Sequence, residues 1–283
     1  MTAVPETEAA VQAVDHAEKA FDPGELIMHH IIDRPEVEIP FVGTYSLDPL
    51  HVPGLGWDIP ITRTVVMMWI AAALLLVVAL VVARRSKGRL VPRGLGSLLE
   101  IFILYIRDEV ARKVIPTHAD RYVGLLLTTF FFILTCNLLG LVPGMSTATG
   151  AISVTASLAI VSFLAVQSAG IRQYGVVGHF RNLIPHGLPV WLLPIMIVVE
   201  VLGMFSRPFA LCIRLFANMT AGHVIIISLI SIIFIFKSAW MAVVSVPFVL
   251  FIDVLELLVA FIQAFIFTML TALFIGMAVH PAH

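Results

Sequence analysis

The sequence predicts an all-α integral membrane protein, and three observations support this class. Hydrophobic residues make up 60% of the 283 residues and charged residues only 12%, whereas a soluble domain is roughly half apolar and a quarter charged. Five apolar runs are each long enough to cross about 30 Å of hydrocarbon as a helix. The basic residues gather mainly in the loops beside these runs, which argues for a membrane-flanking role and against nucleic-acid binding.

Residues 1–58 are expected to form a polar segment outside the cytoplasm. They hold most of the acidic residues, and they lack the basic start and apolar core of a cleavable signal peptide. We therefore expect this segment to belong to the mature protein and residues 59–283 to form the membrane domain.

The membrane domain is expected to contain five spans and one helix on the membrane surface. In residues 96–115, Leu98 and Phe102 share an apolar stripe while Glu100 and Arg112 stay on the polar side, which is the pattern of an interfacial helix. The expected spans are residues 65–83, 122–142, 152–171, 190–236 and 240–279.

The last two runs are each about twice as long as one perpendicular crossing requires. Each run could form a hairpin of two short spans, or one long helix that is steeply tilted or bent. No cluster of turn residues interrupts either run at its middle, and Pro194, Pro208 and Pro247 can kink a helix without ending it. The sequence therefore favours two long helices.

The charges of the loops predict the orientation. Residues 84–121, between the first and second spans, hold more than half of the Lys and Arg residues. The loop after the third span adds Arg172 and Arg181, whereas residues 142–151, between the second and third spans, hold none. Because positively charged loops stay in the cytoplasm, five crossings place the C-terminus in the cytoplasm and the N-terminus outside.

Charged residues inside the fourth run are the first candidates for function. Glu200, Arg207 and Arg214 are seven residues apart, so two helical turns bring each to nearly the same face. Arg214 matters most, because a guanidinium stays protonated and holding it in the membrane is costly unless it serves transport or a counter-charge. Glu200 and Arg207 have a simpler alternative, in which they extend to the lipid headgroups.

Polar residues on the last run form a second group. Asp253, Glu256 and Gln263 fall within one sector of a helix. His223 lies on nearly the opposite face from Arg214, so antiparallel helices could turn it toward Glu256. Alternatively, Gln263 only joins two helices through a hydrogen bond of its side chain.

Other motifs exclude several kinds of site. Cys136 and Cys212 both lie in apolar runs, where packing is the expected role and no disulfide or metal site follows. The sequence contains no glycine-rich phosphate loop followed by Lys and Ser or Thr. We therefore expect neither a cofactor nor a nucleotide on this chain.

The run from Arg214 to His223, Arg-Leu-Phe-Ala-Asn-Met-Thr-Ala-Gly-His, resembles the signature of subunit a of the rotary F-type ATP synthase membrane (Fo) sector, of the bacterial type. Glu256, followed seven residues later by Gln263-Ala-Phe-Ile-Phe, is similar to the last helix of that family. The resemblance covers nearly the whole chain, because further matches occur at Asp22 to His30, Asn182 to Gly187 and Ser206-Arg207-Pro208.

The resemblance implies a stator that is not itself catalytic. It forms two half-channels that pass protons to and from the carboxylates of a ring of c subunits, which couples the proton gradient to rotation and ATP synthesis. Arg214 matches the family's essential arginine, which faces the ring. Four residues match positions of the family's outer half-channel: Asn218, His223, Glu256 and Gln263. Glu200 matches a position of the inner exit path. Further candidates for proton translocation are Asp253, Arg207 and Ser206.

The resemblance also implies partners and a location. The expected partners are the c-subunit ring, the b-type peripheral stalk subunits, the remainder of the ATP synthase and membrane lipid, in a bacterial inner membrane. Some bacterial members carry the acid in the fourth run and the histidine in the last, whereas here His223 and Glu256 exchange those places. Either H⁺ or Na⁺ fits as the coupling ion, because the ring supplies the binding carboxylate.

Two other functions compete with this interpretation. A secondary transporter would bind a solute near the midplane, but such proteins typically show internal repeats, which this sequence lacks. A membrane scaffold without transport would leave the cost of the intramembrane charges unexplained.

Overall fold

The computed structural model describes residues 36–39, 43–46, 50–52, 57–59, 61–86, 94–142, 147–181, 192–236 and 238–280, together with Gly24 and Met145. The chain divides into two units. One comprises Met1–Ile32 and Ala221–Val254, and the other comprises Asp33–Thr220 and Leu255–His283. Each unit is described by itself.

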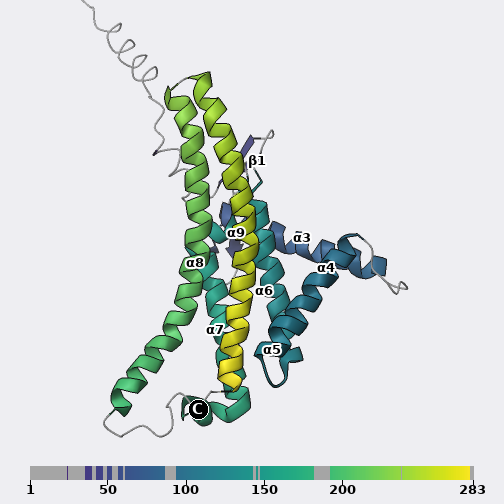
Figure 1. The fold of residues 1–283 in the computed structure, drawn as a ribbon, viewed down its shortest axis with the longest axis vertical. Coiled ribbons are helices and arrows are strands. Elements are labelled where there is room, and N and C mark those ends of the chain that lie inside the picture. The colour runs from purple at the N-terminus through teal and green to yellow at the C-terminus, as the bar shows by residue number, and fades with distance from the viewer. Residues whose placement is uncertain are drawn as a thin grey trace, which may run out of the picture. The chain divides into compact units, whose positions relative to one another are not determined.

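Helices dominate the described residues, which confirms the predicted all-α class of the membrane region (Figure 1). Five of them are long and apolar enough to cross a membrane, namely α3, α6, α7, α8 and α9. In chain order the helices are α3 Arg63–Ser86, α4 Leu95–Leu104, the π-helix η1 Tyr105–Ala111, α5 Arg112–Val114, α6 Ala119–Gly140, the 3₁₀ turn η2 Ala148–Gly150, α7 Ile152–Arg181, α8 Leu193–Phe236 and α9 Ala239–Val279.

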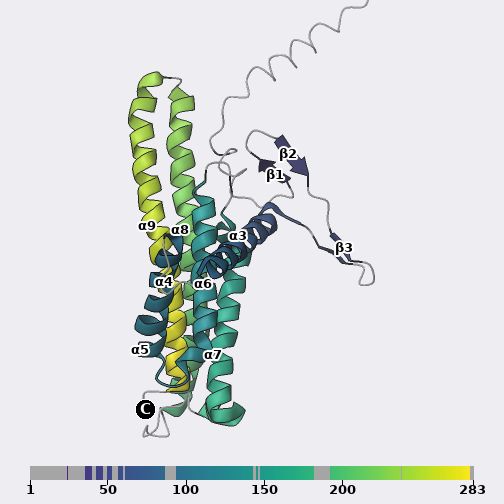
Figure 2. The same cartoon turned by 90° about the vertical axis from the view of Figure 1, so that its right-hand side faces the viewer.

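Two short β-hairpins precede α3, and they were not predicted. Strand β1 (Glu36–Ile39) pairs antiparallel with β2 (Gly43–Ser46), and β3 (Leu50–Val52) pairs antiparallel with β4 (Trp57–Ile59) (Figure 2). The alternation Glu-Val-Glu-Ile in β1 is the sequence signal of a strand. The expected polar segment therefore contains local β structure.

The last two runs each form one continuous helix, as the sequence analysis preferred. Helix α8 has 44 residues and α9 has 41, and each passes through an internal proline, Pro208 or Pro247. At about 1.5 Å per residue such helices are roughly 60 Å long, so they must tilt or bend to fit a bilayer.

Helix α7 continues beyond residue 171, where the third span was expected to end. It reaches Arg181 through an interruption at Gly175, whose φ of 73° and ψ of 171° are non-helical. The last turn folds back on the helix, because the His179 ring packs over Gly170 and its Nε2 lies 2.8 Å from Gln167 Oε1. This local contact explains why polar residues of the expected loop are helical.

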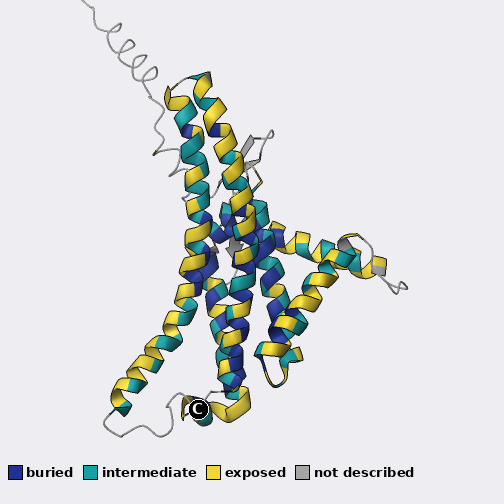
Figure 3. Ribbon diagram, viewed as in Figure 1, coloured by how far each residue is buried: buried dark blue, intermediate teal, exposed yellow. Residues whose placement is uncertain are grey.

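The core of the larger unit is an apolar cluster to which η1, α6, α7, α8 and α9 all contribute (Figure 3). Close packing extends to the backbone, since a Cβ added at Gly276 of α9 would collide with the Val114 carbonyl oxygen. The largest fully buried side chains of the cluster are Ile106, Ile115, Leu126, Ile133, Leu211, Leu215, Phe267 and Ile275.

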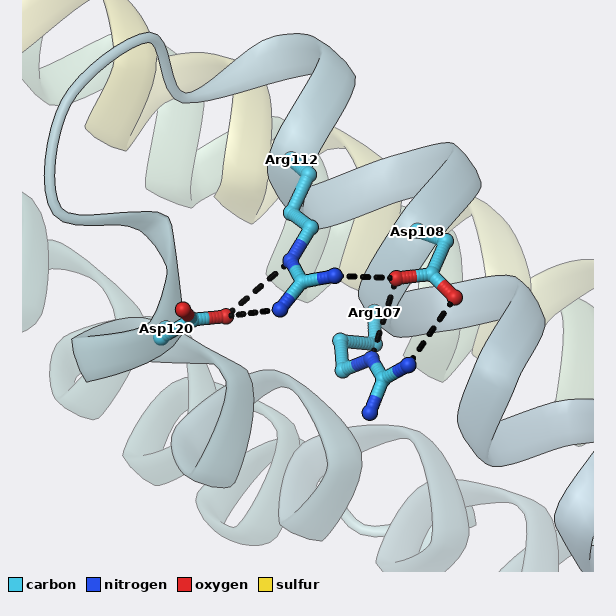
Figure 4. A network of polar contacts seen from close by, with 4 residues as sticks. All are labelled: Arg107, Asp108, Arg112 and Asp120. Atoms are coloured by element: carbon cyan, nitrogen blue, oxygen red, sulfur yellow. Dashed lines mark hydrogen bonds and ion pairs between the residues drawn. The ribbon is translucent and has the colours of Figure 1, made fainter.

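Helices α4, η1 and α5 together cover the expected interfacial helix, with charged residues on its exposed side (Figure 4). Arg107 Nε donates to Asp108 Oδ1 at 3.0 Å, and Arg112 bridges Asp108 and Asp120 at 2.9 and 3.0 Å. The hydrogen bond from Arg107 keeps the pKa of the Asp108 carboxyl below its ordinary value and raises the pKa of the guanidinium. We call these four residues the interfacial charge cluster.

Candidate functional site

Arg214 lies within α8, on the exposed surface of the chain. The same helix turns Leu211, Leu215 and Met219 into the protein, where each is at most 1% exposed. Across the described ranges of the chain, Arg214 has neither an ion pair nor a hydrogen-bond acceptor. A permanent charge therefore stands on an apolar helix without a counter-charge among the described residues of its own chain.

Asn218, one turn beyond Arg214, is tied to the last helix. Its Nδ2 donates to Gln263 Oε1 at 2.8 Å, which brings two of the predicted residues together. Gln263 is 1% exposed, and among the described residues its Nε2 has no hydrogen-bond partner. A buried amide nitrogen without a partner is costly, and the oxygen of a water molecule can accept its hydrogen bond.

Glu200 and Arg207, which the sequence places on one face of the helix, form a pair. Arg207 Nη2 lies 3.5 Å from Glu200 Oε1, and each side chain is about one-third exposed. The Arg207 Cζ atom also stands over the Phe274 ring of α9, 5.6 Å from its centroid. Ser206, the neighbouring candidate, donates back to the Gly203 carbonyl at 3.1 Å, within its own helix.

The remaining predicted residues belong to both units. His223 on α8 and Asp253 on α9 lie in the smaller unit, and both are partly buried. Glu256 lies in the larger unit and is 5% exposed. The expected pairing of His223 with Glu256 therefore stays a prediction.

A buried polar cluster that the sequence analysis missed joins α6, η2 and α9. Asn137 Oδ1 accepts from Thr149 Oγ1 at 2.6 Å, Asn137 Nδ2 points to the Ala260 carbonyl at 3.4 Å, and Thr147 bonds Thr149 at 2.8 Å. The signal was an asparagine in an otherwise apolar run, and an amide at that depth needs partners.

Two further contacts tie this part of α8 to its surroundings. Thr220 Oγ1 lies 3.4 Å from the Gly150 carbonyl, and Cys212 Sγ lies 3.5 Å from Thr155 Oγ1. Both cysteines are free and buried, which agrees with the packing role predicted for them.

Comparison with known proteins identifies the family to which this chain belongs. The profile of the family described as "ATP synthase A chain" matches residues 65–276. A protein named ATP synthase subunit a from Chloroherpeton thalassium is 50% identical, over 93% of this chain and 79% of its own length. A relative named ATP synthase subunit a 2 from Prosthecochloris aestuarii is 48% identical, over 96% of this chain and 85% of its own length. One named ATP synthase subunit a from Myxococcus xanthus is 47% identical, over 90% of this chain and 87% of its own length. The five long apolar helices, the charged α8 and these matches together lead to one conclusion: the chain belongs to the ATP synthase A chain family.

Proposed function

We propose that this chain is the proton-translocating subunit of the membrane sector of an ATP synthase, a stator that carries no catalytic site of its own. The observation that carries the proposal is Arg214, which is exposed and has no acceptor in the described part of its own chain. Its counter-charge is then a carboxylate of another subunit, and the rotating ring of c subunits supplies it.

The charge of Arg214 separates two access paths. A ring carboxylate that moves through lipid must be protonated, because an ionised carboxylate is strongly disfavoured in hydrocarbon. Opposite Arg214 the ionised form is favoured, so the proton leaves there. The fixed positive charge also repels protons that would pass directly from one path to the other. Each proton therefore travels with the ring, and a membrane potential contributes about 2.3 kcal/mol per charge per 100 mV.

The outer path runs through the polar residues of α8 and α9. Asn218 and Gln263 are hydrogen-bonded to each other, and the family resemblance assigns Glu256 and His223 to the same path. A histidine and a carboxylate suit reversible proton transfer near neutral pH. Some bacterial members carry the acid on the fourth span and the histidine on the last, and here the two residues have exchanged places. The exchange keeps one histidine and one carboxylate in the same path. Asp253 is a further candidate at its outer end.

The inner path runs past Glu200, where the proton is released to the cytoplasm. Arg207 pairs with Glu200, and Ser206 lies beside them on the same helix. The loop charges favour the corresponding orientation, with residues 1–58 outside and the C-terminus in the cytoplasm of a bacterial inner membrane. Besides the ring, the expected partners are the b-type peripheral stalk, the rest of the synthase and membrane lipid.

Substitution of Arg214 tests the proposal in the whole reconstituted synthase. Arg214→Ala is expected to abolish ATP-driven proton pumping and to increase passive proton leak, because the barrier between the two paths is removed. Pumping is followed by the quenching of a pH-sensitive dye, and leak by proton flow under a potassium diffusion potential. Full ATP-driven pumping by the variant would contradict the proposal.

A further inference from the structure

Arg207 is held by two groups of different kinds. One is the Glu200 carboxylate, whose Oε1 lies 3.5 Å from Nη2. The other is the Phe274 ring, whose centroid lies 5.6 Å from Cζ, within the range of a cation–π contact. Phe274 comes from α9, so the guanidinium is tied to a second helix.

The Phe274 ring is a fixed support. It packs against the apolar cluster of the larger unit, near Phe267 and Ile275 on the same helix, which are both fully buried. Side chains in such cores are closely packed and keep their rotamers. The flexible Arg207 side chain gains a defined position from a rigid partner.

The two attractions respond differently to proton transfer. If Glu200 accepts and returns a proton, its charge disappears and reappears in each cycle, and the ion pair weakens whenever it is neutral. The attraction between a guanidinium and an aromatic face does not depend on that charge. Arg207 therefore keeps its place throughout the cycle only because of the ring.

A fixed position for Arg207 matters because Arg214 lies seven residues further along the same face of α8. A guanidinium released from Glu200 could reach toward the carboxylate that Arg214 must meet, and the two arginines would then compete for it. The ring also keeps Arg207 Nη2 on Glu200 Oε1, which leaves Oε2 available to exchange the proton with water.

We propose that Phe274 is a positioning residue for proton release, whose ring holds Arg207 beside Glu200 while the charge of Glu200 changes. This inference rests on the proposed function, in which Glu200 belongs to the inner path. It assigns Phe274 a part in proton translocation although it carries no proton itself.

The test compares two substitutions at this position in the reconstituted synthase. Phe274→Leu removes the aromatic face, and we expect proton flow to fall roughly three- to tenfold, the range of one cation–π contact. Phe274→Tyr keeps the face, and its flow is expected to stay within about twofold of the unsubstituted protein. In an Arg207→Gln background, Phe274→Leu is expected to cause no further loss, because the ring acts by holding that guanidinium.

A matched control separates this effect from simple loss of packing. Phe265 of α9 also packs against the apolar cluster, but its ring meets Tyr105, 5.9 Å between centroids, instead of a cation. Phe265→Leu should leave proton flow within about twofold, measured per amount of assembled complex. If Phe274→Leu lowers assembly, Arg207→Gln serves in its place, since it removes the cation and leaves the ring.

Three results would overturn the inference: unchanged flow in Phe274→Leu, equal losses in Phe274→Leu and Phe274→Tyr, or an additive loss in the Arg207→Gln background. Failure of the proposed function is distinguishable, because Arg214→Ala would then retain coupled pumping whatever residue stands at position 274.

Discussion

The arginines of the interfacial charge cluster and Arg214 on α8 differ in where their counter-charges lie. Arg107 and Arg112 each have a carboxylate of the same chain within 3.0 Å. Arg214 has no such partner in the parts of the chain that the structure describes. The first arrangement is electrically complete within one chain, whereas under the proposed function the second is complete only in an assembly. An arginine without a described partner in the middle of a long apolar helix is therefore a better guide to function here than the number of charges in a region.

Neutralising one arginine from each region gives the largest expected contrast. Arg214→Gln should lower ATP-driven proton pumping by roughly a hundredfold or more, as expected when one partner of a desolvated charge pair is removed. Arg112→Gln should leave pumping within about twofold, because exposed ion pairs contribute only about 0.2–1 kcal/mol. Both are measured by dye quenching in vesicles that contain equal amounts of synthase. Similar losses in the two variants would remove the distinction between the regions.

Gln263→Leu examines the polar contact nearest to Arg214. The substitution leaves the Asn218 Nδ2 donor without its acceptor, and we expect proton flow to fall about tenfold. Stability should fall by no more than about 1 kcal/mol, because Asn218 is exposed and the unpaired Gln263 Nε2 is removed as well. Adding Asn218→Leu should recover part of the stability, because both partners are then apolar, while proton flow stays low. Recovery of flow together with stability would indicate that this pair only joins the helices.

Gly140→Ala addresses packing beside the buried polar cluster. A Cβ at this position would collide with the Thr147 side chain, whereas a Cβ at Gly124 of the same helix would meet nothing within 4 Å. We expect Gly140→Ala to destabilise the protein by about 1–3 kcal/mol through overpacking. Gly124→Ala should be neutral or slightly stabilising, since alanine is the better helix former. Thermal unfolding of the purified chain in detergent compares the two, and equal midpoints would contradict the packing shown here.

Acid titration gives the smallest expected effect and concerns the interfacial charge cluster. The pKa of Asp108 is lowered from its ordinary value of 3.8, mainly by the hydrogen bond from Arg107. A lowered folded-state pKa means that its contribution to stability is present above the unfolded value and is lost as pH falls through the folded one. The Arg107–Asp108 pair should therefore be unchanged between about pH 8 and pH 5 and dissociate only below about pH 4. The carbon-13 chemical shift of the Asp108 carboxyl follows this, and a midpoint above the ordinary value would contradict it.

The sequence was sufficient to predict the helices, because hydrophobic length and the absence of turn residues decide whether a run can be one helix. It favoured single long helices for α8 and α9, and the structure contains them. It missed the hairpins β1–β2 and β3–β4, whose short alternating segments carry a much weaker signal than an apolar run of twenty residues. It also did not anticipate that helix resumes after Gly175 and reaches Arg181, because the contact of His179 with Gly170 is visible only after folding.

The candidate site was predicted in part, for a similar physical reason. Polar residues in apolar runs are conspicuous, so Asn218, Gln263 and Glu200 were all identified from the sequence. Their partners depend on which helices meet, and helical spacing alone predicted only that Glu200 and Arg207 share a face. Phe274 could not be identified, because a phenylalanine in an apolar helix is ordinary until a guanidinium is found over its ring.

Cross-linking between this chain and the ring tests most directly that Arg214 faces a carboxylate of another subunit. Ala210 and Ala217 flank Arg214 at one turn and are exposed like it, whereas Met219 is 1% exposed. After replacement of Cys136 and Cys212, cysteines at positions 210 and 217 are paired in turn with a cysteine beside the acidic residue of the c subunit. If Arg214 faces the ring, disulfides should form from both positions and none should form from Met219→Cys. Absence of cross-links from positions 210 and 217, in a synthase that still pumps protons, would contradict it.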